Sequence, residues 1–550
     1  MKNGVAFISG VALGAIGCIG LSNKQHSKKR LVGGNRLLVG GNKLVQFTYD
    51  GTQTEFPEEP FRCIVADNVT SINNGDFSNS SFLTAITISS SVTKIEEGVF
   101  SECASLTTIL VHDENKFFSS IDGVLFNKDN TSLLIYPRGK TDTNYKIPSS
   151  VTTVGDFAFI YCTSLTTVDI HSSITSIGET AFGGCSSLTS ITIPSSVTII
   201  RDYAFAECYS LRTITVDENN KNFTSDCGIL FNKDKTKLLS YPSGIISKRY
   251  DLPSDVKIIG DGAFYGCTSL GRVDVPDDSK LKSIGKGAFQ ECSSLKSFYI
   301  PYELKLKSIG SAAFINCSSL TYIQLPKSVK SIGPGSFYGC SSLPNIEIPY
   351  EIKSIEDYSF MNCTSLKTFI IPDDSHLTSI GSGAFKSCSL TSVTIPAASQ
   401  LTSIGDNAFS NCNSLTTITI SDSVTSIGSK AFFYCSGLTT VEISASSQLT
   451  SIGSDAFFYC TSLTNITIPN LVTTIGSSAF FNCSGLTTVE ISASSQLTTI
   501  GDYAFANCTS LTPFDTSNVK TVGEGIFDGC KTSSTIKNGG EKYRKKKCET

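Results

Sequence analysis

Residues 411–434 read NCNSLTTITISDSVTSIGSKAFFY, and this stretch holds one complete unit of the pattern that governs the chain. Leu415, Ile418 and Ile420 follow the L-x-x-I-x-I spacing of a short strand whose apolar side chains point inward. Thr417 and Thr419 then point out of the sheet, because successive side chains of a strand alternate between its two faces. The first half of the unit therefore predicts a strand with a hydroxyl-rich outer face.

The second half of the unit predicts a second strand and a turn. Val424 and Ile427 mark a second short extended segment, and Gly428 allows the chain to bend after it. Residues 429–434 are predicted to form about one helical turn, which places Phe432 in the wall of the protein. Each unit thus holds two short strands and one helical turn, and stacked units are expected to form two narrow parallel sheets.

The Phe-x-x-Cys pair of this unit recurs along the chain, in most cases every 23 or 25 residues. The pairs are Phe100/Cys103, Phe159/Cys162, Phe182/Cys185, Phe205/Cys208, Phe264/Cys267, Phe289/Cys292, Phe314/Cys317, Phe337/Cys340, Phe360/Cys363, Phe385/Cys388, Phe409/Cys412, Phe432/Cys435, Phe457/Cys460, Phe480/Cys483, Phe505/Cys508 and Phe527/Cys530, preceded by the variant Phe77/Ser80. Repetition at this period predicts a solenoid, because one such unit cannot bury its apolar face without neighbours.

Sixteen of the 20 cysteines occupy this single slot of the repeat. Stacked coils at the parallel-strand spacing of roughly 4.8 Å would line the sulfurs up inside the wall. A buried free cysteine packs as a small hydrophobe, which favours a packing ladder over systematic disulfides between coils. Cys18, Cys63, Cys227 and Cys548 lie outside the ladder, and no pair of them has metal-site spacing.

Two longer steps of 59 residues, from Cys103 to Cys162 and from Cys208 to Cys267, contain insertions. Residues 123–129 read GVLFNKD and residues 228–234 read GILFNKD, followed by LLIYP and LLSYP respectively. Two apolar runs around an Asn-Lys-Asp turn predict a β-hairpin near 112–147 and another near 217–252. The second strand of each hairpin is expected to rejoin the ladder.

The ends of the chain differ from the repeats. Residues 1–21 contain an uncharged apolar run at 5–21, which predicts a secretory signal peptide, an uncleaved membrane anchor, or neither. Residues 22–60 are rich in Gly, Asn and Lys and are interpreted as a linker or N-terminal cap. The repeats occupy 61–530, and residues 531–550 are predicted to form a basic disordered tail.

Residues 187–208, SLTSITIPSSVTIIRDYAFAEC, resemble the leucine-rich repeats of the BspA-like surface proteins of bacteria and protozoa nearly throughout. The paired GVLFNKD-type insertions are also typical of that family. The resemblance covers roughly 61–530 and implies an α/β leucine-rich-repeat solenoid, a right-handed coil of short parallel strands. It further implies display on a cell surface and adhesion to host proteins, epithelium or other microbes.

Nothing in the sequence predicts catalysis, a cofactor or a metal site. The four histidines have no Cys, Asp or Glu partner at metal-ligand or triad spacing, and GxGxxG, P-loop and HExxH motifs are absent. A net charge of −4 is too small to favour nucleic acid as a partner. The sequence therefore indicates a non-enzymatic protein that binds other proteins.

The outward strand positions of the middle coils differ from the monotonous Thr-rich positions of the C-terminal coils. They combine tyrosines with Arg, Asn and Gln, which are residue types that recognise protein partners. The candidate partner-binding residues are Arg272, Asp274, Tyr299, Tyr302, Tyr322, Gln324, Asn345, Glu347 and Tyr350. The alternative is that exposed tyrosines simply suit strands.

Three hypotheses of function follow. The first is a cell-surface or secreted repeat protein that mediates adhesion or protein–protein interaction with host or neighbouring cells. The second is an intracellular, cytoplasmic repeat scaffold, and the third is a passive surface antigen without a dedicated ligand. Membrane contact is expected only through residues 5–21, and only if they are not cleaved.

Overall fold

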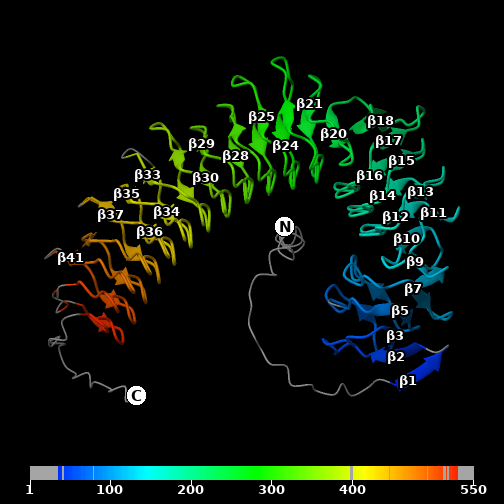
Figure 1. Cartoon of the computed structure of the whole chain (residues 1–550), viewed down its shortest axis with the longest axis horizontal. Helices are drawn as coiled ribbons and strands as arrows, with labels where there is room; N and C mark the ends of the chain where they lie inside the picture. Colours follow the sequence, from blue (N-terminus) through cyan, green and yellow to red (C-terminus); the bar gives the residue numbers. More distant parts are fainter. Residues whose placement is uncertain are drawn as a thin grey trace.

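The computed structural model describes residues 35–39, 42–78, 80–396, 400–444, 446–491, 494–511, 514, 516 and 519–530. The coils stack along one arc that runs from β1 at the N-terminal end to the last coils at the C-terminal end (Figure 1). Parallel strands connect neighbouring coils in two ladders, so the predicted solenoid of parallel strands is confirmed.

The longer strands come from the L-x-x-I-x-I half of each unit, and their outward side is called the sheet face. These strands are β3 (Phe61–Val65), β5 (Leu83–Ile88), β7 (Thr108–Val111), β11 (Asn144–Lys146), β13 (Thr167–Asp169), β15 (Ser190–Ile193), β17 (Thr213–Val216), β21 (Arg249–Asp251), β23 (Arg272–Asp274), β25 (Ser297–Tyr299), β27 (Tyr322–Ile323), β29 (Asn345–Glu347), β31 (Thr368–Ile370), β33 (Ser392–Thr394), β35 (Thr417–Ile420), β37 (Thr440–Ile443), β39 (Asn465–Ile468) and β41 (Thr488–Ile491). In β35, Ile418 and Ile420 are buried and Thr417 is exposed, as the spacing predicts.

The second ladder consists of two-residue strands from the second half of each unit. They are β4 (Ser71–Ile72), β6 (Lys94–Ile95), β12 (Thr153–Val154), β14 (Ser176–Ile177), β16 (Ile199–Ile200), β22 (Ile258–Ile259), β24 (Ser283–Ile284), β26 (Ser308–Ile309), β28 (Ser331–Ile332), β30 (Ser354–Ile355), β32 (Ser379–Ile380), β34 (Ser403–Ile404), β36 (Ser426–Ile427), β38 (Ser451–Ile452), β40 (Thr474–Ile475), β42 (Thr499–Ile500) and β43 (Thr521–Val522). The isoleucines of this ladder are mostly buried and complete the wall opposite the longer strands.

Additional strands occur at the N-terminal end and in the two insertions. They are β1 (Asn35–Val39), β2 (Asn42–Tyr49), β8 (Phe118–Ile121), β9 (Val124–Asn127), β10 (Ser132–Ile135), β18 (Phe223–Asp226), β19 (Ile229–Asn232) and β20 (Lys237–Ser240). Antiparallel pairs β9–β10 and β19–β20 form the predicted hairpins, and β10 and β20 then pair in parallel with β12 and β22. The second strand of each hairpin thus rejoins the ladder.

The prediction of one helical turn per repeat is wrong, because none of the described residues forms a helix. Around Phe409, successive backbone N–H groups donate alternately to the next coil and to their own coil. Asn407, Phe409 and Asn411 donate to carbonyls of the next coil at 2.9, 2.7 and 2.7 Å, whereas the amides between them close turns three residues back within their own coil. Asn407 and Asn411 adopt left-handed backbone with φ of 56° and 60°. An α-helix would need all of these donors for itself, and the neighbouring coil takes every second one.

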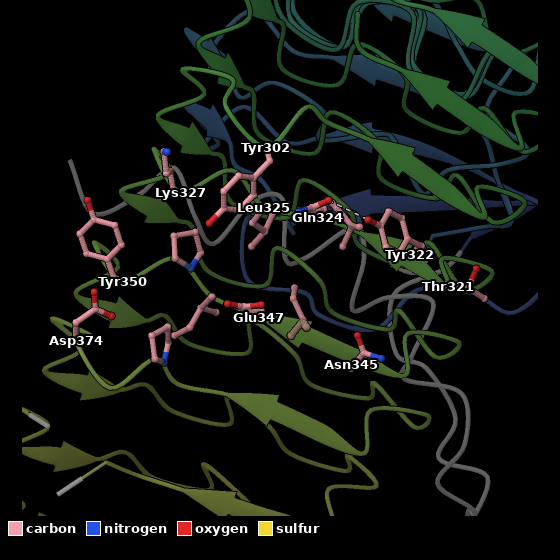
Figure 2. Close-up of a pocket in the computed structure, with 15 residues that line it drawn as sticks. Tyr302, Thr321, Tyr322, Gln324, Leu325, Lys327, Asn345, Glu347, Tyr350 and Asp374 are labelled. Carbon is pink, nitrogen blue, oxygen red and sulfur yellow. Dashed lines mark hydrogen bonds between the residues drawn. The ribbon is translucent and has the colours of Figure 1, made fainter. Parts of the chain in front are cut away.

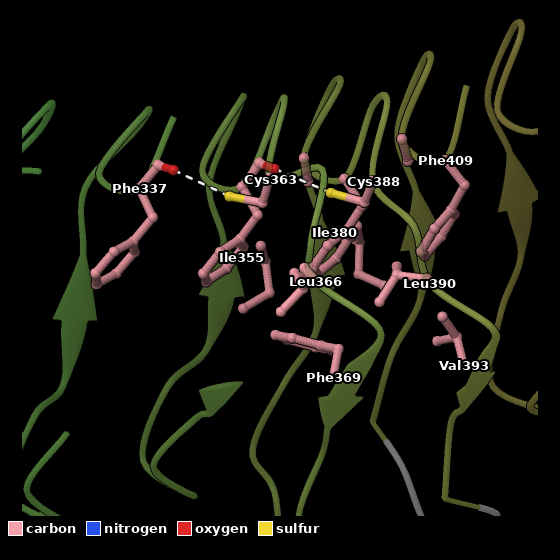
Figure 3. Packing of buried hydrophobic residues seen from close by; sticks show 14 of the residues in the cluster. Phe337, Ile355, Cys363, Leu366, Phe369, Ile380, Cys388, Leu390, Val393 and Phe409 are labelled. Atoms are coloured by element: carbon pink, nitrogen blue, oxygen red, sulfur yellow. Dashed lines mark hydrogen bonds between the residues drawn. The ribbon is translucent and has the colours of Figure 1, made fainter. Parts of the chain in front are cut away.

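This row of turns, called here the turn ridge, carries the Phe and Cys ladders into the core. Neighbouring rings stack nearly parallel, for example Phe337 on Phe360 at 5.4 Å between centroids and 2° between planes. Most ladder thiols lie near a phenylalanine carbonyl one step before them, such as Cys363 Sγ at 3.1 Å from Phe337 O and Cys388 Sγ at 3.1 Å from Phe360 O (Figure 3). After the two insertions the carbonyl belongs to a tyrosine, Tyr136 for Cys162 and Tyr241 for Cys267. The ladder cysteines are free and nearly all buried, as the packing interpretation predicts.

Candidate functional site

The sheet face is interrupted at a seam between the coil of β27 and β28 and the coil of β29 and β30. The longer ladder that begins at β21 ends at β27 and restarts at β29, and the shorter ladder ends at β28 and restarts at β30. No inserted hairpin separates these two coils in sequence. A hollow of about 420 Å³ lies on the sheet face at this seam (Figure 2).

Proline at position 344 removes one backbone hydrogen bond from the longer ladder at the seam. In the preceding coil Thr321 donates its N–H to Lys296 O at 2.9 Å, and in the following coil Lys367 donates to Pro344 O at 3.0 Å. Pro344 stands at the same distance after its ladder cysteine, Cys340, but has no N–H to donate. One rung of the longer ladder is therefore missing at the seam, where the shorter ladder is interrupted as well.

Six of the nine candidate residues surround this hollow: Tyr302, Tyr322, Gln324, Asn345, Glu347 and Tyr350. The three tyrosine side chains expose large apolar surfaces to solvent. The exposed fractions are 51% for Tyr302, 50% for Tyr322 and 37% for Tyr350. They come from three successive coils, and Figure 2 shows them spread around the opening. Residues 48 positions apart in sequence thus contribute to one surface.

The polar groups of the hollow are mostly hydrogen-bond acceptors and carboxylates. Tyr322 donates its hydroxyl to Gln324 Oε1 at 3.0 Å, which fixes both side chains at one end. Lys327 Nζ lies 2.8 Å from Glu303 and 5.7 Å from the centre of the Tyr302 ring, and the neighbouring Glu303 carboxylate raises the pKa of Lys327. Glu347 also lines the hollow, so its surface is aromatic with a mixed, slightly acidic rim.

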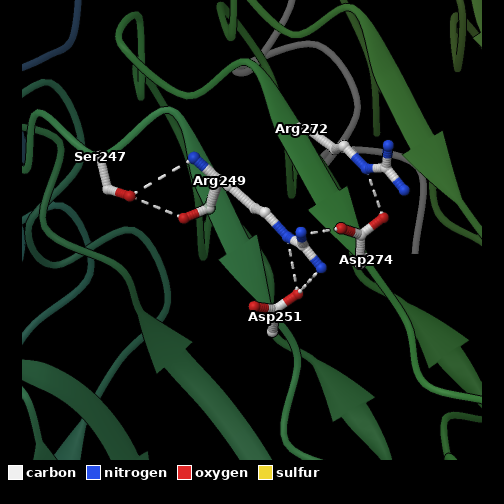
Figure 4. Close-up of polar contacts among 5 residues, drawn as sticks. All are labelled: Ser247, Arg249, Asp251, Arg272 and Asp274. Carbon is white, nitrogen blue, oxygen red and sulfur yellow. Dashed lines mark hydrogen bonds and ion pairs between the residues drawn. The ribbon is translucent and has the colours of Figure 1, made fainter.

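Arg272, Asp274 and Tyr299 do not line the hollow. Asp274 was expected to point outward, but it is only 9% exposed, because two arginines cover it. Arg272 Nε lies 2.6 Å from its Oδ1 and Arg249 Nε 2.9 Å from its Oδ2, while Arg249 also pairs with Asp251 at 2.8 Å (Figure 4). Tyr299 is exposed on β25, between this ion-pair network and the hollow.

Sequence reasoning missed three residues that shape the hollow: Pro344, Lys327 and Asp374. A signal for each was present. Lys327 and Asp374 follow the strands of their coils at the corner where Tyr302 and Tyr350 were noticed, so reading the same corner in every coil would have found them. Pro344 stands where most other coils have Thr or Lys, and its missing N–H predicts the missing rung.

The described part of the chain contains no group of three or more His, Cys, Asp or Glu residues placed to hold a metal ion. Among the same residues, no helix is long and apolar enough to cross a membrane. The apolar run at 5–21 and the tail at 531–550 lie outside the described residues.

The repeats match a known family over most of the chain. The BspA type leucine rich repeat region is found in six overlapping copies that together span residues 61–542. The chain belongs to this family. The expected resemblance to BspA-like proteins is therefore confirmed, and the BspA-type leucine-rich-repeat solenoid is a fold that typically carries no catalysis and generally mediates protein–protein interaction.

The solved structures that resemble this chain include three bacterial proteins. A leucine-rich repeat protein from Bacteroides ovatus is 28% identical, with 72% of this chain and 90% of that chain covered and a TM-score of 0.40. The pneumococcal vaccine antigen PcpA is 20% identical, with 75% and 96% covered and a TM-score of 0.42. A leucine rich cell surface protein from Faecalibacterium prausnitzii is 22% identical, with 86% and 96% covered and a TM-score of 0.29. No curated protein matches the chain.

Proposed function

We propose that this BspA-type protein is a non-enzymatic cell-surface protein that adheres to a protein on host or neighbouring cells through the hollow at the seam. The observation that carries the proposal is that six residues, selected from outward positions on three coils, surround one hollow. The two coils on either side of the seam provide most of its lining, so the feature that interrupts the repeat also creates the surface.

The chemistry of the hollow suits a protein partner. Tyrosine buries a large area with few rotatable bonds and is enriched among the residues that dominate binding energy at interfaces. A hollow of about 420 Å³ accommodates one or two partner side chains, and Gln324 and Asn345 on its wall provide amide groups that fix their orientation. An aromatic floor with a polar rim is the arrangement expected for the centre of a specific interface.

The proposal also holds that the hollow does not bind nucleic acid, because its charged groups repel phosphate. Glu347 and Asp374 line the hollow and repel phosphate groups, and its lysine is already paired with Glu303. Binding of labelled single-stranded RNA or DNA to the full chain at physiological salt would contradict this part of the proposal.

Surface display completes the proposal. Residues 5–21 would act as a secretory signal, or as an anchor if they are not cleaved. Intact, unpermeabilised cells should be labelled by an antibody against residues 61–530. Labelling that appears only after permeabilisation would overturn the surface assignment and favour an intracellular scaffold.

The adhesion test compares two tyrosine pairs. Beads coated with the full chain are counted on epithelial and microbial cells. The double variant Tyr322→Ser with Tyr350→Ser is expected to reduce adhesion at least tenfold. Each of the two substitutions removes an aromatic contact worth about 1–2 kcal/mol at an interface. The matched control is Tyr434→Ser with Tyr459→Ser, two stacked tyrosines on the turn ridge that are expected to leave adhesion unchanged.

The thermal unfolding midpoint of the Tyr322/Tyr350 variant should equal that of the wild type, since these rings are half exposed. Adhesion that persists in the variant would refute the hollow as the binding site. Wild-type beads that adhere to no cell type would favour the third hypothesis, a passive surface antigen.

A further inference from the structure

A second cavity lies on the turn ridge, where the insertion at 217–252 separates two successive turns. It has a volume of about 100 Å³, enough for several waters or for one side-chain head group. Its wall includes Glu207 from the last turn before the insertion and Tyr265 and Gln290 from the two turns after it. Tyr203 spans the same gap and donates its hydroxyl to Lys286 O at 2.7 Å.

One polar atom of this wall has no partner. Tyr265 donates its hydroxyl to the carboxylate of Glu207, so its oxygen can only accept a hydrogen bond from Gln290. Gln290 meets this need with its Nε2, at 3.1 Å from the Tyr265 hydroxyl. Its Oε1 is then left without any hydrogen-bond partner among the described residues, although Gln290 is only 2% exposed. Leaving a buried acceptor unpaired costs about 1–3 kcal/mol, which indicates that a donor is missing.

The carboxylates of the cavity also lack a cation. Burial raises the pKa of Glu207, and the nearby carboxylate of Glu291 raises it further. Burial likewise raises the pKa of Glu179, and its neighbour Asp156 raises it again. Arg201 opposes this shift at Glu179, but its guanidinium is bound to Asp156 at 3.1 Å. The lining residues thus present acceptors and negative charge and include no cation. The guanidinium of Arg138 lies outside the lining, 4.8 Å from the centre of the Tyr161 ring at the edge of the cavity.

The first insertion shows what fills the equivalent gap. There the chain reads Tyr136-Pro-Arg-Gly139, and in the second insertion it reads Tyr241-Pro-Ser-Gly244. Arg138 donates from Nη1 to Ser101 O at 2.6 Å, and its guanidinium lies 4.8 Å from the centre of the Tyr161 ring. The second insertion has Ser243 in place of this arginine, and the Ser243 hydroxyl is buried without a partner among the described residues.

The repeat register links this difference to the cavity. Ser101 follows Phe100 as Ala206 follows Phe205, and Ala206 lines the cavity. A guanidinium at the second insertion, placed as Arg138 is at the first, would therefore reach the edge of the cavity. The chain supplies this cation at one insertion and omits it at the other.

We infer that the cavity on the turn ridge binds the guanidinium of an arginine side chain presented by a partner protein. The guanidinium donates to Gln290 Oε1 and to the Glu207 carboxylate, both of which need donors. Tyr203 and Tyr265 provide aromatic walls that attract a flat cation, whereas the Tyr161 ring is already in contact with Arg138. This site lies on the turn ridge, whereas the hollow proposed for adhesion lies on the sheet face, so the two inferences stand independently.

The test titrates the full-length protein with N-acetyl-arginine amide, followed by saturation-transfer NMR of the probe. N-acetyl-citrulline amide, which has the same shape without the charge, serves as the reference and is expected not to bind. Glu207→Gln should weaken arginine binding at least tenfold. The matched control is Glu102→Gln, which occupies the same register at the first insertion and should leave binding unchanged.

A second variant tests the comparison between the insertions directly. Ser243→Arg would supply the cation from within the chain and should abolish binding of the probe while Glu207 remains in place. Tyr322→Ser, on the sheet face, should not affect it. The inference is overturned if the arginine probe does not bind the wild type, if citrulline binds equally well, or if Glu207→Gln binds as the wild type does.

Discussion

The coils that follow residue 400 and the coils at the seam are built from the same unit but differ at one backbone donor. In the regular region Thr416 donates both its N–H and its hydroxyl to Thr391 O, at 3.0 and 3.1 Å, and Thr439 repeats this at Thr416 O with 2.9 Å for each. At the seam Pro344 provides neither donor, and the hollow lies beside it. The regular region presents a flat row of threonines, and the irregular region presents three exposed tyrosines.

This difference teaches that both strand ladders of a solenoid can be interrupted between two coils if the turn ridge is continuous. Across the seam the turn ridge is uninterrupted: Phe314 stacks on Phe337 at 5.3 Å and 1° between planes, and Phe314 donates its N–H to Ser336 O at 2.7 Å. A repeat protein can therefore form a recess where its ladders are interrupted, without an inserted loop, because each coil contacts its neighbours through two ladders and the turn ridge.

The largest effect should come from ionising the cysteine ladder, which is common to both regions. Burial raises the pKa of each described ladder thiol for which a shift is resolved above the ordinary 9.0, to about 12 for Cys103 and to about 11 for Cys530. Above pH 9 the unfolded chain releases thiol protons that the folded chain retains, so stability falls by about 1.4 kcal/mol per pH unit for each such thiol. The contribution of the buried thiols to the free energy of unfolding is fully present below pH 9. The coils at the seam and the coils after residue 400 should therefore unfold together between pH 9 and 11.

Denaturant midpoints measured from pH 7 to 10.5 with reducing agent present would check this. Cys412→Ala is the matched variant and should lower the slope of stability against pH by the contribution of one thiol. Equal midpoints at pH 7.5 and 10 would contradict it.

A smaller and local effect is expected from removing one of the stacked phenylalanine rings. Phe337→Ala and Phe432→Ala should each cost about 3–5 kcal/mol, because both rings are fully buried. Both ladders are interrupted beside Phe337 and continuous beside Phe432, so Phe337→Ala should split unfolding into two transitions, whereas Phe432→Ala should lower the midpoint of a single transition. Calorimetry or hydrogen exchange resolves this, and identical profiles for the two variants would show that the seam is not a weak point.

The smallest effect should come from repairing the missing rung. Pro344→Thr restores an N–H and a hydroxyl facing Thr321 O and is expected to stabilise the protein by about 0.5–1.5 kcal/mol. Closing the seam should also narrow the hollow, so adhesion falls while stability rises. Thr416→Pro, the reverse change in the regular region, should destabilise without creating adhesion. Stronger adhesion by Pro344→Thr would contradict the link between the broken rung and the site.

Much of this architecture follows from the sequence alone because its causes are periodic. Spacing and burial determine several features, which were therefore predictable. These are the inward positions of Ile418 and Ile420, the burial of Cys412, and the return of strands β10 and β20 to the ladder. The helical turn was not, because residues 405–412 satisfy local helix spacing equally well. Only the presence of the next coil, which accepts the amides of Asn407 and Phe409, decides against the helix.

The candidate site was predictable in part for the same reason. Outward tyrosines can be identified from alternation, and Tyr302, Tyr322 and Tyr350 prove to line one hollow. Alternation does not reveal pairing within one face, so the burial of Asp274 under Arg249 from the previous coil was missed. The separation of two coils at Pro344 is a property of neighbours and not of a single repeat.

The left-handed turn positions have a consequence for glycosylation signals. Asn316, Asn362, Asn482 and Asn507 each precede a ladder cysteine that is followed by Ser or Thr, and all four have φ between 55° and 63°. Asparagine tolerates this backbone better than most residues, so the turn selects it for conformation. Asn316 also uses its Nδ2 to hold Glu291 at 2.7 Å, in the position where a glycan would be attached. An N-x-S/T sequence at this position is therefore accounted for by the geometry of the turn, and its presence does not by itself indicate a glycan.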